Sequence, residues 1–92
     1  MILVIDIGNT NVKIGVFDGD ELVHSIRLAS SSRKTSDEYF MSMKNLLEMK
    51  GINLKDIDGV IMSSVNPTLN YTFEHFISYY FGFEPMSVGN KI

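Results

Sequence analysis

The chain has 92 residues, 45% hydrophobic and 21% charged, which suits one small folded domain or part of a larger one and excludes a disordered chain. The net charge is −3 and no run of Lys or Arg occurs, so charge gives no argument for nucleic acid binding. Cysteine is absent, which excludes disulfides, thiolate metal sites and a cysteine nucleophile.

The first residues predict a buried strand. Ile2–Ile7 is a short apolar run, rich in β-branched residues and interrupted by Asp6. The run is too short for a signal peptide and lacks a basic leader. No apolar stretch approaches the roughly 20 residues needed to cross a bilayer. We therefore expect a cytoplasmic protein with no membrane contact.

Two more strands are predicted after a first turn. Residues 12–18 alternate between apolar and other side chains, and residues 21–28 alternate again. The Asp-Gly-Asp sequence at 18–20 indicates a tight turn between them, because Gly accepts positive φ without steric cost. The first three strands are expected to form an antiparallel meander.

A helix is predicted after the polar loop at 29–34. Thr35 and Glu38 have the spacing of a capping box, in which both side chains bind free amides of the first turn. Apolar residues then recur at helical spacing, and Gly51 is the expected stop.

The remaining residues predict a strand, a helix and a short strand. Residues 59–65 form a buried strand, and Asn-Pro at 66–67 opens the next helix because Pro fits its first position. Gly82 ends this helix, and residues 84–88 form the last strand. The order β-β-β-α-β-α-β predicts an α/β fold, a mixed sheet with helices packed on it.

No linker divides the chain, so residues 1–92 are expected to form one unit. The final residues, 88–92, contain no closing element of secondary structure. A sheet that ends there would leave an edge open, or a face that something else covers.

One segment between the first two strands favours phosphate chemistry. Gly8 allows the backbone to turn sharply and approach a ligand, and amides of the turn can point at a phosphate oxygen. Thr10 and Asn11 supply neutral donors, and Lys13 adds a positive charge. Asp6 would repel phosphate directly, so its expected task is to hold Mg²⁺, directly or through water. The candidate ATP-binding residues are Asp6, Ile7, Gly8, Asn9, Thr10, Asn11, Val12 and Lys13.

The same residues have a purely structural interpretation. Gly-Asn-Thr-Asn is also good hairpin-turn chemistry, and Asp6 could simply accept hydrogen bonds from amides of the turn. The residue types alone leave both interpretations open.

Several motifs, in order along nearly the whole chain, resemble type III pantothenate kinases, which belong to the actin-like, ribonuclease-H-like superfamily. Asp-Ile-Gly-Asn-Thr-Asn at 6–11 is similar to the first phosphate motif of that family. The other similar segments are Phe-Asp-Gly-Asp at 17–20, Arg-Lys-Thr-Ser-Asp-Glu-Tyr at 33–39, Ser-Ser-Val-Asn-Pro at 63–67, Phe-Gly-Phe-Glu-Pro at 81–85 and Val88-Gly89. Asn66 stands where family members frequently have an apolar residue.

The resemblance implies a fold and a reaction. It implies that residues 1–92 are the incomplete amino-terminal, ATP-binding lobe of a ribonuclease-H-like kinase, with a second lobe beyond residue 92. The implied reaction is ATP-dependent phosphorylation of pantothenate on its terminal hydroxyl, the first step of coenzyme A synthesis. Implied cofactors are Mg²⁺ and a monovalent cation, K⁺ or NH4⁺, and the implied assembly is a homodimer. Asn9 is also implied to lie near the acceptor.

The resemblance also implies which parts are missing. The general base of the family is an Asp in a Gly-x-Asp-Arg motif beyond residue 92, so no catalytic residue is expected in this chain and the chain alone is expected to be inactive. Two alternatives stay open. One is a non-catalytic regulatory or partner-binding relative of the same fold, and the other is an actin-like kinase that acts on a different small molecule.

Overall fold

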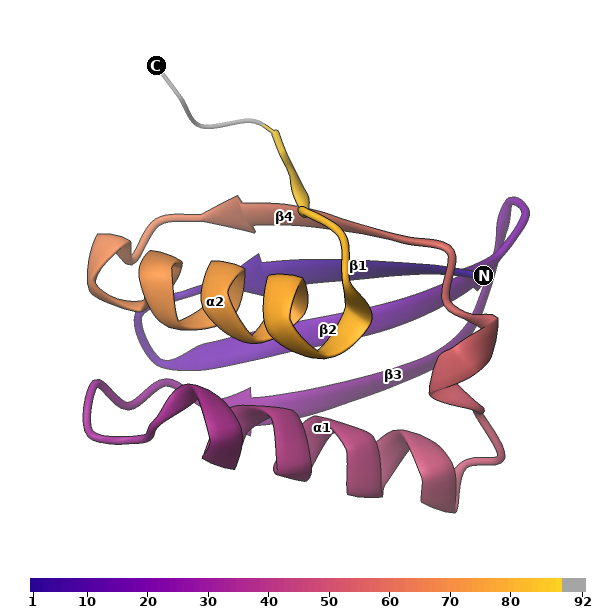
Figure 1. Ribbon diagram of the computed structural model, residues 1–92, viewed down its shortest axis with the longest axis horizontal. Helices are drawn as coiled ribbons and strands as arrows, with labels where there is room; N and C mark the ends of the chain where they lie inside the picture. Colours follow the sequence, from indigo (N-terminus) through magenta and orange to yellow (C-terminus); the bar gives the residue numbers. More distant parts are fainter. Residues whose placement is uncertain (89–92) are drawn as a thin grey trace.

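The computed structural model describes residues 1–88, in which two helices cover one side of a five-stranded sheet (Figure 1). The strand order is β3-β2-β1-β4-β5, with β1, β2 and β3 antiparallel and β4 and β5 parallel to β1. The predicted meander and element order are therefore confirmed. The elements are β1 (Ile2–Ile7), β2 (Asn11–Asp18), β3 (Glu21–Ala29), α1 (Ser36–Met49), β4 (Gly59–Ser64), α2 (Asn70–Phe81) and β5 (Met86–Ser87), with 3₁₀ turns η1 (Leu54–Asp56) and η2 (Pro67–Leu69).

The two faces of the sheet differ because successive side chains of a strand point to opposite sides. Those that point toward the helices are apolar and buried, and they form one core with the inner faces of α1 and α2. The strand residues of this core are Leu3, Ile5, Ile7, Val12, Ile14, Val16, Ile26, Leu28, Val60 and Met62. The alternate positions, which include Asp6 and Lys13, lie on the face that the helices leave open.

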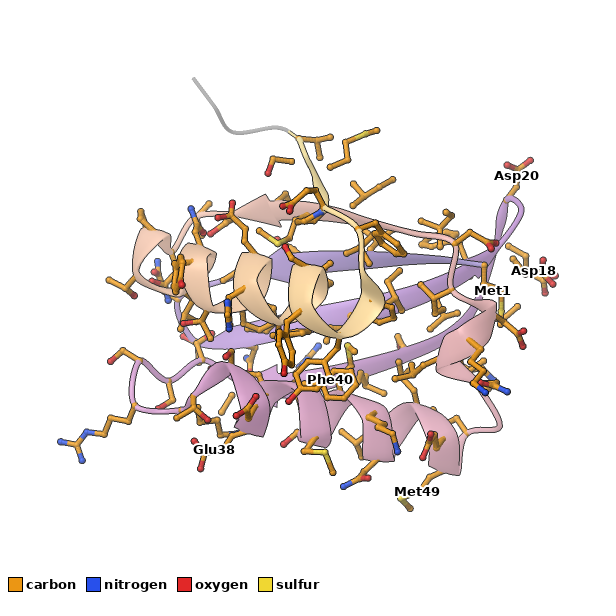
Figure 2. The ribbon with its side chains drawn as sticks, viewed as in Figure 1. Met1, Asp18, Asp20, Glu38, Phe40 and Met49 are labelled. Carbon is orange, nitrogen blue, oxygen red and sulfur yellow. The ribbon has the colours of Figure 1, made fainter. Side chains whose placement is uncertain are left out.

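The start of α1 has the predicted capping box. The hydroxyl of Thr35 accepts a hydrogen bond from the amide of Glu38 at 3.1 Å, and the carboxylate of Glu38 accepts one from the amide of Thr35 at 2.8 Å. Figure 2 shows Glu38 at this end of the helix. At the other end, Gly51 has a φ of 85°, a conformation that other residues adopt only with strain. Both predicted boundaries of α1 are confirmed.

The second helix begins later than predicted. Asn66 lies outside the helical region, with φ −128° and ψ 85°, because a proline follows it. Pro67–Leu69 then forms a 3₁₀ turn, and the α-helix begins at Asn70. Gly82 ends it with a φ of 82°, as predicted.

The last strand is shorter than predicted. Residues 84–88 were expected to form it, but only Met86 and Ser87 pair with β4. Pro85 has no amide hydrogen and cannot donate to the ladder, so pairing starts after it. Gly89, part of the sequence resemblance, lies outside the described residues.

Tyr80, on α2, lies at the margin of the core and not inside it. Its ring is 40% exposed and stacks on Phe40 at 3.8 Å between centroids, which joins α2 to α1. Its hydroxyl donates to the carboxylate of Asp37 at 2.6 Å, and this hydrogen bond raises the pKa of Tyr80. Tyr80 of α2 therefore contacts α1 through both its ring and its hydroxyl.

A hydroxyl inside the core generates a stability prediction. Tyr39 is fully buried, and its oxygen accepts a hydrogen bond from the amide of Ser31 at 2.8 Å. Tyr39→Phe leaves that amide without a partner and should lower the free energy of unfolding by about 1–3 kcal/mol, measured by denaturant unfolding.

Tyr79→Phe is the matched control, because Tyr79 is 71% exposed and its change should stay within about 0.5 kcal/mol. Equal stability of the two variants would show that the buried hydroxyl does not support the loop after β3.

Candidate functional site

Three connecting segments meet at one edge of the sheet. The first is the turn 8–11 between β1 and β2, and the others follow β3 at Ser30 and β4 at Asn66 (Figure 1). Because β1 and β4 run parallel, their carboxyl ends reach the same edge. This is the edge at which open α/β sheets commonly bind ligands.

The turn is closed by a short backbone hydrogen bond. The amide of Gly8 donates to the carbonyl of Asn11 at 2.9 Å, and a Cβ atom added to Gly8 would lie only 2.8 Å from that oxygen. Position 8 therefore requires glycine, because any side chain would collide with the carbonyl oxygen of Asn11. Asn9 and Thr10 are exposed, and within residues 1–88 their amides have no backbone or side-chain acceptor. Two adjacent free amides can bind an anion.

Asp6 is exposed on the open face, near the end of β1. Its neighbours in the sheet are Lys13 on β2 and Ser63 on β4. The hydroxyl of Ser63 donates to Oδ1 of Asp6 at 3.3 Å. The structural alternative, in which Asp6 accepts from amides of the turn, is not what the described residues show.

A row of polar side chains crosses the sheet beside the turn. The register places Ser63, Asp6, Lys13 and Arg27 next to one another on four adjacent strands. Like charges directly opposite each other destabilise a sheet, yet Lys13 faces Arg27, and no salt bridge of the described residues involves either. Both cations are thus available to an anion bound at this edge.

Arg27 and Ser63 lie in one row with Asp6, although the sequence pattern did not identify them as members of its site. Arg27 could not have been placed by pairing the predicted strands regularly, because its position opposite Lys13 depends on an irregularity in the register at Val16 and Phe17. Ser63 belongs to the segment at 63–67 that resembles the family, but its place beside Asp6 depends on the parallel pairing of β1 with β4, which could not be deduced from local pattern.

The candidate residues of the turn and its flanks divide by orientation. Ile7 and Val12 are fully buried, so their side chains support the turn from the core side. Asn11 is half-buried, and the side chains of Asn9 and Thr10 are exposed. The parts of the segment that a ligand can reach are the exposed side chains and the free amides.

Asp6 is the carboxylate at this edge that could bind a magnesium ion. Within residues 1–88 no three His, Cys, Asp or Glu side chains gather into a metal-binding group. Mg²⁺ is usually held by one or two carboxylates together with water and phosphate oxygens. The exposed carboxylate of Asp6, supported by Ser63, fits an ion that arrives with phosphate and does not form a protein-only metal site.

Comparison with known proteins gives consistent matches over the whole chain. The family described as type III pantothenate kinase matches residues 2–92. Proteins named type III pantothenate kinase from Geobacillus and from Halalkalibacterium halodurans are 48% and 46% identical over all 92 residues. The chain spans 36% of the length of each of these curated relatives.

A solved structure supports the fold. One similar structure is the activator of 2-hydroxyisocaproyl-CoA dehydratase from Clostridium difficile with bound ADPNP. The match covers 70% of this chain and 24% of the activator chain, with a TM-score of 0.54 and 22% sequence identity. The chain thus has the ribonuclease-H-like fold that the family resemblance implied. No helix within residues 1–88 is long and apolar enough to cross a membrane.

The close approach at Gly8 can be tested without any ligand. Gly8→Ala forces either the Asn11 carbonyl or the turn to shift, and we expect it to destabilise the protein by about 1–3 kcal/mol in thermal or denaturant unfolding. The matched control is Gly59→Ala, where the added Cβ would meet only the flexible end of Ile2 at 3.3 Å. If Gly8→Ala were as stable as Gly59→Ala, the turn would not depend on glycine.

Proposed function

The chain belongs to the type III pantothenate kinase family, and from this premise we propose that it is the ATP-binding lobe of an enzyme that phosphorylates pantothenate at the start of coenzyme A synthesis. The supporting observation is the edge of the sheet at which two free amides, of Asn9 and Thr10, lie beside one carboxylate and two cations. This combination suits a polyphosphate with a divalent ion.

Each group at the edge has a proposed task toward ATP. The amides of Asn9 and Thr10 donate to phosphate oxygens, and Lys13 and Arg27 offset the negative charge of the tail. Asp6 holds Mg²⁺, directly or through water, and Ser63 orients its carboxylate. Magnesium, when bound, neutralises charge on the β- and γ-phosphates.

The chemistry proposed for this lobe is positioning and charge stabilisation. Phosphoryl transfer needs the attacking hydroxyl, the phosphorus and the leaving oxygen in line, and little covalent work from the protein. The turn fixes the ATP end of that line, and Asn9 lies toward the acceptor. The base that takes the proton of pantothenate is proposed to be an Asp beyond residue 92, within a Gly-x-Asp-Arg motif.

Further features of the proposal rest on the family alone. A monovalent cation, K⁺ or NH4⁺, is held by residues beyond this chain, and the complete protein is a homodimer with a second lobe. The reaction takes place in the cytoplasm. The acceptor is tested by following ATP consumption by the complete protein with pantothenate and with a panel of sugars and acyl acids. Consumption with pantothenate alone is the expected result, and preference for another acceptor would overturn the assignment.

Asp6→Asn tests the metal-binding task in the complete protein. Asparagine keeps the shape and can still accept from Ser63, but it lacks the charge that holds Mg²⁺. We expect kcat to fall by at least about 100-fold with unchanged thermal stability. Asp20→Asn is the matched control, because it removes the same charge from the hairpin between β2 and β3, which Figure 2 shows at the opposite end of the strands. Normal turnover by Asp6→Asn would contradict the proposal.

The 92-residue chain alone is proposed to be inactive, because the general base lies beyond it. Incubation of the purified chain with ATP, Mg²⁺, K⁺ and pantothenate should produce no phosphopantothenate by mass spectrometry. The complete protein, assayed in parallel, is the positive control. Product formed by the chain alone would show that a base lies within residues 1–92.

A further inference from the structure

The carbonyl of Gly8 is held by two side chains from different loops. The hydroxyl of Ser30, just after β3, donates to it at 2.8 Å. The side-chain amide of Asn66, just after β4, donates to it from the other side of the edge at 3.3 Å. Both lone pairs of the carbonyl oxygen are therefore used within the protein.

The orientation of Asn66 is itself determined by its neighbours. A carbonyl oxygen can only accept, so the nitrogen of the Asn66 side chain must face Gly8. Its oxygen accepts from the hydroxyl of Thr68 at 2.6 Å, and its backbone amide donates to the hydroxyl of Ser64 at 3.0 Å. These two bonds hold Asn66 in the rotamer that reaches the turn.

Two neighbouring carbonyls of the turn accept hydrogen bonds from backbone amides and not from side chains. The carbonyl of Ile7 accepts from the backbone amide of Val65 at 3.0 Å, and that of Thr10 accepts from the backbone amide of Ser30 at 2.9 Å. Among these carbonyls, and within residues 1–88, only that of Gly8 accepts from side chains, so a substitution can remove the groups that hold it.

Anchoring this carbonyl fixes the direction of the next amide. A peptide group is planar and trans, so its C=O and N–H point in opposite directions. The Gly8 carbonyl points toward Ser30 and Asn66, and the N–H of Asn9 therefore points away from them. That N–H is one of the two amides of the turn without an acceptor in residues 1–88.

We propose that Ser30 and Asn66 are positioning residues for the polyphosphate of the nucleotide, acting through the Gly8–Asn9 peptide group. Neither side chain touches the phosphates. Together they hold the Asn9 amide in the direction in which it donates to a phosphate oxygen before the nucleotide arrives, so that binding does not have to order the turn. This inference rests on the proposed function of the turn.

The test compares ligands with and without phosphate, using the complete protein. Ser30→Ala removes one donor, and Asn66→Asp places an oxygen where the nitrogen met the carbonyl. Loss of a single hydrogen bond should raise Kd for a non-hydrolysable ATP analogue and KM for ATP about 3- to 10-fold, and the double variant should lose more. The affinity for adenosine and the KM for pantothenate should not change. Ser30→Thr keeps the hydroxyl and should restore wild-type affinity.

Matched controls separate this effect from general damage. Ser32→Ala alters an exposed serine of the same loop, and Asn45→Asp makes the same chemical change on the exposed side of α1. Both should bind the ATP analogue as the wild type does. If Asn66→Asp does not fold, Thr68→Val removes the bond that orients Asn66 and should raise the same Kd.

Two outcomes would overturn the inference while leaving the proposed function intact. One is wild-type affinity for the ATP analogue in both Ser30→Ala and Asn66→Asp. The other is a parallel loss of adenosine and ATP-analogue binding, which would indicate a change in the fold and not in the turn. A wild-type protein that neither binds the analogue nor phosphorylates pantothenate would instead refute the proposed function.

Discussion

The hydrogen bond from the Gly8 amide to the Asn11 carbonyl, 2.9 Å long, sets the shape on which the candidate site depends. It closes the turn so tightly that no Cβ atom fits at Gly8. The closed turn in turn sets the register of β1 against β2, which places Asp6 opposite Lys13. A different turn would shift that register, and a shift of β2 by one residue against β1 would move Lys13 to the helix-covered face.

One face of the sheet is apolar and covered by the helices, and the other face carries the polar side chains of the candidate site. The helices bury the apolar positions of β1 and β2, including Ile7 and Val12 on either side of the turn. Because alternate side chains point the other way, the same strands present Asp6 and Lys13 to the open face. The turn is thus held from below by the core and from its flanks by Ser30 and Asn66.

Local features of the sequence predicted much of this arrangement. Alternation revealed the three strands of the meander, and the spacing of Thr35 and Glu38 revealed the start of α1. The ends of elements were harder to predict: the last strand is shortened by Pro85, and a 3₁₀ turn at Pro67–Leu69 precedes the α-helix that begins at Asn70.

Contacts between distant residues were the part of the site that sequence reasoning could not supply. Ser63 meets Asp6 only because β4 lies parallel to β1, and Asn66 reaches the Gly8 carbonyl only because the segment after β4 returns to the same edge. Arg27 faces Lys13 only because the register of β2 and β3 shifts at Val16 and Phe17, which the alternating pattern of the two strands did not reveal. The turn residues were proposed from the chemistry of a Gly beside small polar residues and from the family resemblance, but the side chains that hold the turn, Ser30 and Asn66, lie far along the chain.

The most direct test of the account is a crystal structure of the complete protein with Mg²⁺ and a non-hydrolysable ATP analogue. We expect the β- and γ-phosphates at the amides of Asn9 and Thr10, with the ion between them and Asp6. A nucleotide whose phosphates lie elsewhere on the protein, with these amides still free, would contradict the central claim that this turn binds the phosphates of ATP.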